Sequence, residues 1–83
     1  MENKENRIAL LGIIVSDGDA VETVNRILHE YGEYVLGRMG LPLRERRVNA
    51  ITLVLDAPSD TINALTGKLG RVGGVSAKAL FGK

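Results

Sequence analysis

Hydrophobic and polar positions along the chain follow two different periods, and each period predicts a different kind of element. An apolar, β-branched run at 8–15, closed by the polar segment 16–19, is typical of a buried strand. Apolar side chains then recur at helical spacing, which predicts a helix at about residues 19–31. The residues with that spacing are Val21, Val24, Ile27, Leu28 and Tyr31.

Signals for the two ends of this helix are also present. Asp19, followed three residues later by Glu22, fits a capping box in which aspartate replaces serine or threonine. Gly32 stands where a left-handed residue often ends a helix, because glycine has no Cβ to clash. The two signals agree with the boundaries that the apolar spacing indicates.

A hairpin is predicted in the middle of the chain. Strands are predicted at 34–41 and 48–55, and the charged segment 43–47 joins them. Pro42 is expected to end the first of these strands, because proline donates no hydrogen bond to a sheet. Gly37 and Gly40, inside the same strand, predict a bend and a close approach to another backbone.

The remaining residues predict a second helix and a last strand. This helix opens at 56–60 and ends near Gly70, and the pair 73–74 turns the chain into a strand at 75–81. Its buried stripe is predicted to be Ile62, Leu65 and Leu69.

The predicted order of elements is therefore β-α-β-β-α-β. Because crossover connections are right-handed, both helices should lie on one face of the sheet. This predicts an α+β, ferredoxin-like βαββαβ sandwich with a four-stranded antiparallel sheet in the order 4-1-3-2. We expect a single domain at 7–83 after a disordered tail at 1–6.

The second face of this sheet needs an explanation, because its strands are apolar on both sides while helices cover only one. So much aliphatic surface is near the limit for a soluble monomer, so we expect a homo-oligomer, a dimer or tetramer, packed through this face. Small residues such as Gly12, Gly40 and Ala50 would let two sheets approach closely. The alternative is that these are ordinary scattered exposed aliphatics. The predicted interface residues are Leu11, Tyr34, Leu36, Ala50, Thr52 and Val54.

Composition mainly excludes functions. The 83 residues include no cysteine, so no disulfide framework is expected. The chain has 11 basic and 10 acidic residues, so no general attraction to nucleic acid is expected. The polar start of the chain does not resemble a signal peptide. The longest apolar run is much shorter than the ~20 residues of a membrane span. We expect a cytoplasmic protein without a membrane partner.

The chain contains few residues suited to catalysis or to metal binding. His29 is the one histidine, so a single chain offers no metal site, although copies of His29 could meet in an oligomer. No serine or cysteine accompanies it as a nucleophile. Acylphosphatases share the topology but place an arginine in the first loop, where this chain has 16–19 without one. We therefore expect no enzyme activity and no cofactor.

Nucleic-acid binding by base stacking is also disfavoured, because strands 8–15 and 48–55 contain no aromatic residue. Thr66-Gly67-Lys68 is not a phosphate loop, because Leu69 follows and the segment closes a helix. Two interpretations remain for the arginines of the hairpin: a solvated tip, or a surface that contacts phosphate. These residues are Arg44, Arg46 and Arg47.

A small-molecule effector is the other open possibility. The loop before the first helix leads to a helix N-terminus, where Asp17 disfavours an anion, so a ligand there should present an amine, as an amino acid does. The predicted ligand residues are Asp17, Gly18, His29 and Arg38.

Short segments of the chain carry a family resemblance. LHEYG at 28–32, GRMG at 37–40, RER at 44–46 and ALTGKLG at 64–70 together resemble the iron-only hydrogenase system regulators of anaerobic bacteria, over about residues 7–80. The resemblance implies an ACT-like domain with a regulatory role and no catalytic residues. The chain is also similar to the oligomerisation and nickel-sensing domain of the nickel-responsive repressor. The histidine and cysteine ligands of that domain have no counterparts in this chain.

The function expected from these observations is a non-enzymatic regulatory module that oligomerises and senses an effector. The alternative is docking on nucleic acid or protein through the basic hairpin at 44–47, with no small-molecule ligand.

Overall fold

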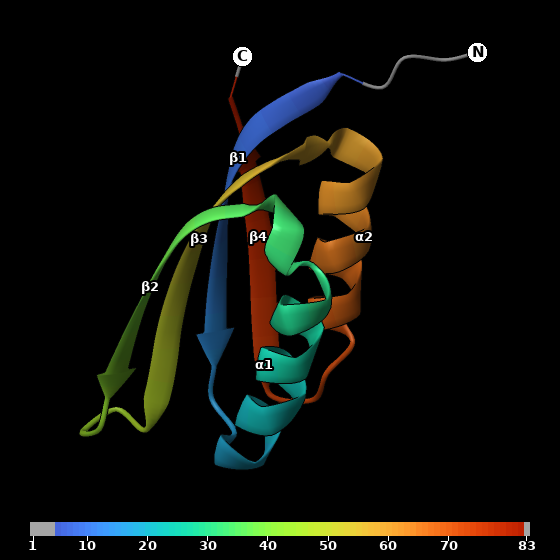
Figure 1. The fold of residues 1–83 in the computed structure, drawn as a ribbon. Coiled ribbons are helices and arrows are strands. Elements are labelled where there is room, and N and C mark those ends of the chain that lie inside the picture. The colour runs from blue at the N-terminus through green and yellow to red at the C-terminus, as the bar shows by residue number, and fades with distance from the viewer. Residues whose placement is uncertain (1–4, 83) are drawn as a thin grey trace.

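The elements of the protein follow one another in the order that the patterning predicts. The computed structural model describes residues 5–82, in which strands and helices alternate as β-α-β-β-α-β (Figure 1). They are β1 (Asn6–Val15), α1 (Val21–Glu30), β2 (Val35–Leu43), β3 (Val48–Pro58), α2 (Ser59–Gly70) and β4 (Val75–Phe81). Two 3₁₀ turns flank α1, η1 (Gly18–Ala20) and η2 (Gly32–Tyr34).

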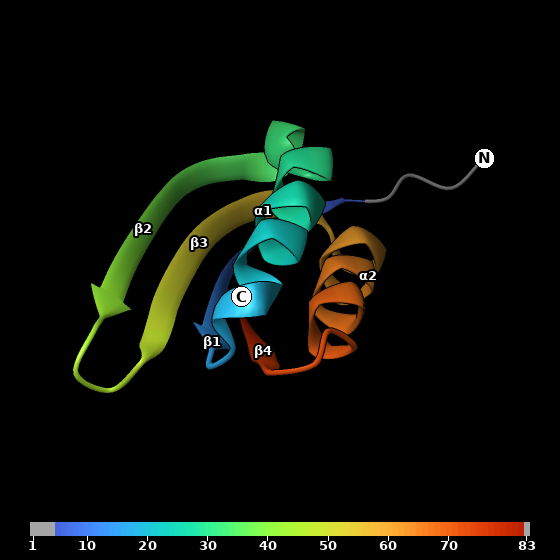
Figure 2. The same ribbon diagram turned by 90° about the horizontal axis from the view of Figure 1, so that it is seen from below.

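The four strands form one sheet in the order β2-β3-β1-β4, and every neighbouring pair is antiparallel. Counted from the other edge, this is the predicted order 4-1-3-2. Figures 1 and 2 show α1 and α2 together on one face of the sheet. The α+β ferredoxin-like sandwich is thus confirmed.

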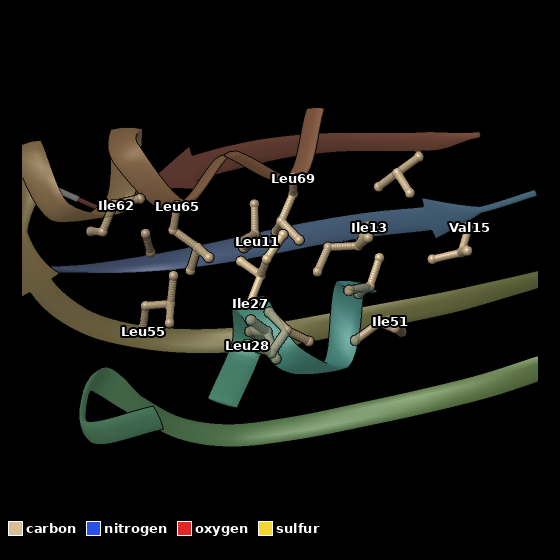
Figure 3. Close-up of a cluster of buried hydrophobic side chains, with 14 of the residues drawn as sticks. Leu11, Ile13, Val15, Ile27, Leu28, Ile51, Leu55, Ile62, Leu65 and Leu69 are labelled. Carbon is tan, nitrogen blue, oxygen red and sulfur yellow. The ribbon is translucent and has the colours of Figure 1, made fainter. Parts of the chain in front are cut away.

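The core fills the space between the sheet and the helices (Figure 3). Leu11 of β1, Leu53 of β3 and Leu69 of α2 have no exposed surface. Each fully buried leucine stabilises the fold by about 1.5–3 kcal/mol relative to an exposed one. The stripe predicted for the second helix, Ile62, Leu65 and Leu69, is buried as expected, and among the described residues the buried set contains no polar side chain.

A glycine closes the corner where β1 ends and β4 begins. Gly74 has a φ of 79°, and a Cβ there would lie 2.5 Å from the Cβ of Asp17. The Ser16 amide donates a hydrogen bond of 2.8 Å to the Gly74 carbonyl. Both the backbone conformation and the space therefore require glycine.

The ends of α1 differ from their predictions. Asp17, not Asp19, supplies the cap: its side chain accepts a hydrogen bond of 2.9 Å from the Asp19 amide at the start of η1. Ala20 precedes α1 with no side-chain cap, so the predicted capping box is wrong. Gly32 is not left-handed either, because the chain continues from α1 directly into η2.

Three strands are longer than predicted, and β3 continues to Pro58 instead of ending at residue 55. β2 continues through Pro42, which pairs with Asn49; this is tolerated because β2 is an edge strand and needs partners on one side only. β1 already includes Asn6, opposite Pro58. Residues 1–4 of the predicted tail lie outside the described residues.

The β2–β3 hairpin curves away from the helices, so its end is an arm that no helix covers (Figure 2). We use "arm" for residues 41–50. Its turn is closed by hydrogen bonds from the Arg46 amide to the Leu43 carbonyl and from the Arg47 amide to the Arg44 carbonyl, 3.1 and 3.2 Å long. Arg47 takes a left-handed φ of 55° there.

Candidate functional site

The side of the sheet away from the helices is apolar. Successive residues of a strand point to opposite faces, so Leu11 and Ile13 enter the core while Leu10 and Ile14 face away, 42% and 44% exposed. Register extends this face across all four strands, and we call it the open face. It comprises Ile8, Leu10, Gly12 and Ile14 of β1, Gly37, Met39, Leu41 and Leu43 of β2, Val48, Ala50, Thr52, Val54 and Asp56 of β3, and Ser76, Lys78 and Leu80 of β4.

Large aliphatic side chains dominate the open face, and its charged residues are Lys78 and Asp56. Seven large hydrophobic side chains on it are between 41% and 68% exposed. They are Ile8, Leu10, Ile14, Met39, Leu41, Leu43 and Leu80. This is a largely apolar patch over a whole sheet face, the kind of surface that marks an interaction site.

A β-bulge decides which residues of β2 join that face. Val35 pairs with Leu55 and Gly37 with Val54, so Leu36 is an extra residue without a partner in β3. The extra residue reverses the alternation of side chains beyond it. Arg38 therefore lies opposite Leu53, on the helix side, and Met39 lies on the open face.

This bulge corrects the sequence interpretation of the second strand. A regular strand would place Arg38 and Gly40 on the uncovered side and Met39 with the core; the observed register does the reverse. Gly37 inside a strand was the available signal for a bulge. The predicted bend is there, but its effect on the alternation depends on the pairing with β3.

The Arg38 side chain links β2 to α1. One of its guanidinium nitrogens, Nη2, donates a hydrogen bond of 2.9 Å to the side-chain oxygen of Asn25 on α1. Arg38 has no carboxylate partner in the described part of the chain. Its remaining N–H donors are thus open to other acceptors, because a guanidinium carries five.

A cleft of about 250 Å³ opens on the arm side of this bridge, and we call it the arm cleft. Its polar side chains are those of Asn25, Arg38 and Asn49, and no acidic residue lines it. Gly40 and Pro42 form part of its wall. Its apolar lining includes Val15, Val21, Val24 and Ile51. The cleft thus combines one cation and two amides with an aliphatic floor.

A second cleft of about 250 Å³ lies on the other side of Arg38, toward the end of α1. His29 and Gly32 line it together with Asn25 and Arg38. The predicted ligand residues His29 and Arg38 thus share one cleft.

Asp17 and Gly18 do not join them. They precede α1, whereas His29 lies in its last turn, and ten helical residues span about 15 Å. Gly18 instead faces a shallow hollow beside the arm, with Arg44 and Arg47. The four residues that we predicted as one ligand site are therefore in two places.

The predicted interface residues also separate. Ala50, Thr52 and Val54 lie on the open face. Leu11 lies in the core with no exposed surface. Both alternating sets of side chains in β1 are apolar, and the set that contains Leu11 is the buried one. Tyr34 belongs to η2 and packs against the core, with its ring centroid 6.5 Å from that of Tyr31.

The arginines of the hairpin lie exposed at the tip of the arm, beyond the helices. The tip is the part of the described chain farthest from the helical layer (Figure 2). Arg44 and Arg47 also line the hollow that contains Gly18, whereas Arg46 does not.

Residues 5–82 lack the features of a metal site and of a membrane-spanning helix. That part of the chain has no group of three or more histidine, cysteine, aspartate or glutamate residues placed to hold a metal ion. None of its helices has the length and apolar character needed to cross a membrane.

The fold and these surfaces define a small ferredoxin-like domain, and comparison with known proteins identifies the family. Residues 7–79 match the TM1266-like family, described as "Iron-only hydrogenase system regulator, putative". The chain belongs to this family. No protein of curated function matches the chain.

Solved structures agree with this assignment. The chain is similar to the uncharacterized protein TM1266 from Thermotoga maritima, with 42% identity and a TM-score of 0.91 over 95% of this chain and 100% of that one. It also shares the fold of the C-terminal domain of the MgtC protein from Mycobacterium tuberculosis. That match has a TM-score of 0.73 and 14% identity, and covers 99% of this chain and 94% of the other.

Proposed function

We propose that this protein is a non-enzymatic regulatory module of an iron-only hydrogenase system that works as a homo-oligomer. In this proposal two copies pack through their open faces, and each copy binds a small-molecule effector on its helix side. The observation that carries the proposal is the open face itself, where seven large aliphatic side chains remain exposed in the single chain.

The size and chemistry of the open face suit a second copy as its occupant. Four strands about 4.8 Å apart and roughly eight residues long give a face of about 500 Å². Two such faces bury on the order of 1,000 Å², the low end of a specific interface. Scarce charge favours a like surface as the partner, and a two-fold axis requires such self-complementarity.

Glycines on the open face support close approach of another backbone. A Cβ at Gly37 would meet nothing within 4 Å, and one at Gly12 would meet only the Lys78 carbonyl at 3.9 Å. Neither has a positive φ. Gly37 adjoins the β-bulge of β2. Since glycine weakens a strand by roughly 0.5–1 kcal/mol relative to alanine, the single chain gives no reason for Gly12. A sheet packed on this face does.

Sedimentation velocity of the wild type and of Leu10→Glu tests the proposal. We expect the wild type to self-associate with a dissociation constant of about 10 µM or tighter. Leu10→Glu should be monomeric, because the interface would bury an unpaired carboxylate. Ala64→Glu, which adds the same charge on the exposed side of α2, is the control and should associate like the wild type. A wild type that stays monomeric throughout the micromolar range contradicts the proposal.

Docking through the tip of the arm is a second candidate function. The exposed position of three guanidinium groups beyond the helices favours it. Binding to a fluorescent DNA duplex should then weaken with salt and be lost in Arg46→Ala/Arg47→Ala, because phosphate contacts release counterions. If this double variant binds DNA as the wild type does, or neither binds, the tip is only a solvated turn.

A further inference from the structure

We infer that the arm cleft binds a small aliphatic monocarboxylate, held by Arg38 and by the side-chain amides of Asn25 and Asn49. This inference rests on the proposed effector-binding function and names the chemical class of the effector. It concerns the helix side of the sheet, so it involves a different surface from the open face.

The charge of the arm cleft selects an anion. Arg38 is exposed, and its described hydrogen-bond partner is a neutral amide oxygen rather than a carboxylate. Guanidinium and carboxylate groups match in planar geometry, and the charge-assisted bonds between them are stronger than a bond to an amide. A ligand carboxylate would thus replace the Asn25 oxygen as the acceptor, and the Asn25 amide could turn its N–H donors toward the ligand.

The rest of the lining limits what that anion can be. No acidic residue lines the cleft, so it has no counterion for an ammonium group or a metal ion. This argues against the amine-bearing ligand that Asp17 suggested in the sequence, because Asp17 does not line the cleft. Arg38 is the one cation in the lining, which fits a single negative charge. Buried Val15, Val24 and Ile51 form an apolar floor for a hydrocarbon body.

The volume sets the size of the ligand. A cleft of about 250 Å³ has room for roughly eight water molecules at about 30 Å³ each, so a ligand with a similar number of non-hydrogen atoms suits it. A branched six-carbon carboxylate such as 4-methylpentanoate has that size.

Gly40 is consistent with a cleft that is kept open. A Cβ at Gly40 would meet nothing within 4 Å, and its φ is not positive, so neither space nor conformation in the described chain requires glycine there. Because Gly40 pairs with Ile51 on the helix side, any larger side chain would project into the arm cleft.

An NMR titration of ¹⁵N-labelled protein with 4-methylpentanoate tests this inference. We expect saturable shifts of the Gly40 amide and the Asn25 side-chain amide, with a dissociation constant of about 1 mM or tighter. The neutral isostere 4-methylpentanamide should bind at least ~10-fold more weakly, because it loses the charge-assisted bonds. Sulfate should bind more weakly too, because it has no hydrocarbon body for the apolar floor.

Two variants locate the site, and a third is the control. Arg38→Gln removes the cation and Gly40→Val fills the cleft; each should weaken binding at least ~10-fold. Arg26→Gln removes an exposed arginine of α1 that does not line the cleft, and it should bind like the wild type. The inference is overturned if the wild type shows no saturable shifts by about 10 mM, if the amide binds equally well, or if either cleft variant keeps wild-type affinity.

The monomeric variant Leu10→Glu separates this inference from the proposed self-association. It should bind 4-methylpentanoate as the wild type does, because Leu10 and the arm cleft lie on opposite sides of the sheet. Binding by a wild type that proves monomeric would retain the ligand site and end the oligomer. A wild type that self-associates but does not bind the carboxylate would retain the oligomer and overturn the ligand site.

Discussion

The two faces of the sheet are nearly alike in hydrophobicity and opposite in surroundings. Leu10 and Leu11 are adjacent leucines of β1, yet their exposed fractions are 42% and 0%. The helical layer removes Leu11 from water, and no described part of the chain does so for Leu10. Apolar residues at both parities of a strand therefore predict that two surfaces need covering, without indicating which of them the helices cover.

The largest expected effect comes from placing a charge on each face in turn. Ile13→Asp should unfold the domain, because an unpaired carboxylate in the core costs several kcal/mol, which is comparable to the ~5–15 kcal/mol stability of a small domain. Ile14→Asp should keep the wild-type circular dichroism spectrum, since this side chain is 44% exposed. Spectra and thermal melts at low micromolar protein measure both. Equal loss of structure in the two variants would mean that both faces are needed to fold.

Truncating the paired leucines gives a smaller difference in the same direction. Leu11→Ala should lower the free energy of unfolding by about 3 kcal/mol through lost burial and a cavity, a drop in Tm of roughly 15 °C. Leu10→Ala should lower it by less than ~1 kcal/mol in dilute solution.

Protein concentration sharpens this comparison. Association stabilises the folded state by mass action, so the Tm of the wild type should rise with concentration. The Tm of Leu10→Ala should rise less. Denaturant titrations and melts over a hundredfold range of concentration check both points, and a concentration-independent Tm for the wild type would count against self-association.

Glycines also differ in whether the single chain requires them. Gly74 is required within the chain, because its φ is 79° and a Cβ would lie 2.5 Å from Asp17. Gly74→Ala should therefore cost about 2 kcal/mol in a urea titration. Gly73→Ala is the matched control, since a Cβ there meets nothing within 4 Å. Equal stability of the two variants would show that the turn adapts.

The smallest expected effect has the opposite sign. Gly12→Ala on the open face should leave the dilute monomer unchanged or raise its stability by up to ~0.5 kcal/mol, because alanine suits a strand better than glycine. The same methyl group should weaken self-association, as measured by sedimentation, by holding two sheets apart. Unchanged association would place Gly12 outside the contact.

Much of the fold could be predicted because it depends on local patterns. The stripe of Ile62, Leu65 and Leu69 requires only helical period, and the strand order follows from right-handed crossovers. The candidate sites were less predictable. A regular alternation would place Arg38 on the uncovered side of the sheet, and one unpaired residue, Leu36, reverses that alternation. That reversal also brings Arg38 to Asn25, which precedes it by 13 residues.

By itself, the sequence determined the kinds and order of the elements, the family, and the presence of more apolar strand surface than two helices can cover. Only the tertiary structure decided which parity of β1 forms the core, which side of the sheet Arg38 faces, and that the predicted ligand residues occupy two places. The physical reason is the range of the interactions. Helical period and turn chemistry act over a few neighbouring residues, and crossover handedness is the same in nearly all proteins. The side of a sheet that a residue faces instead depends on its pairing with a distant strand.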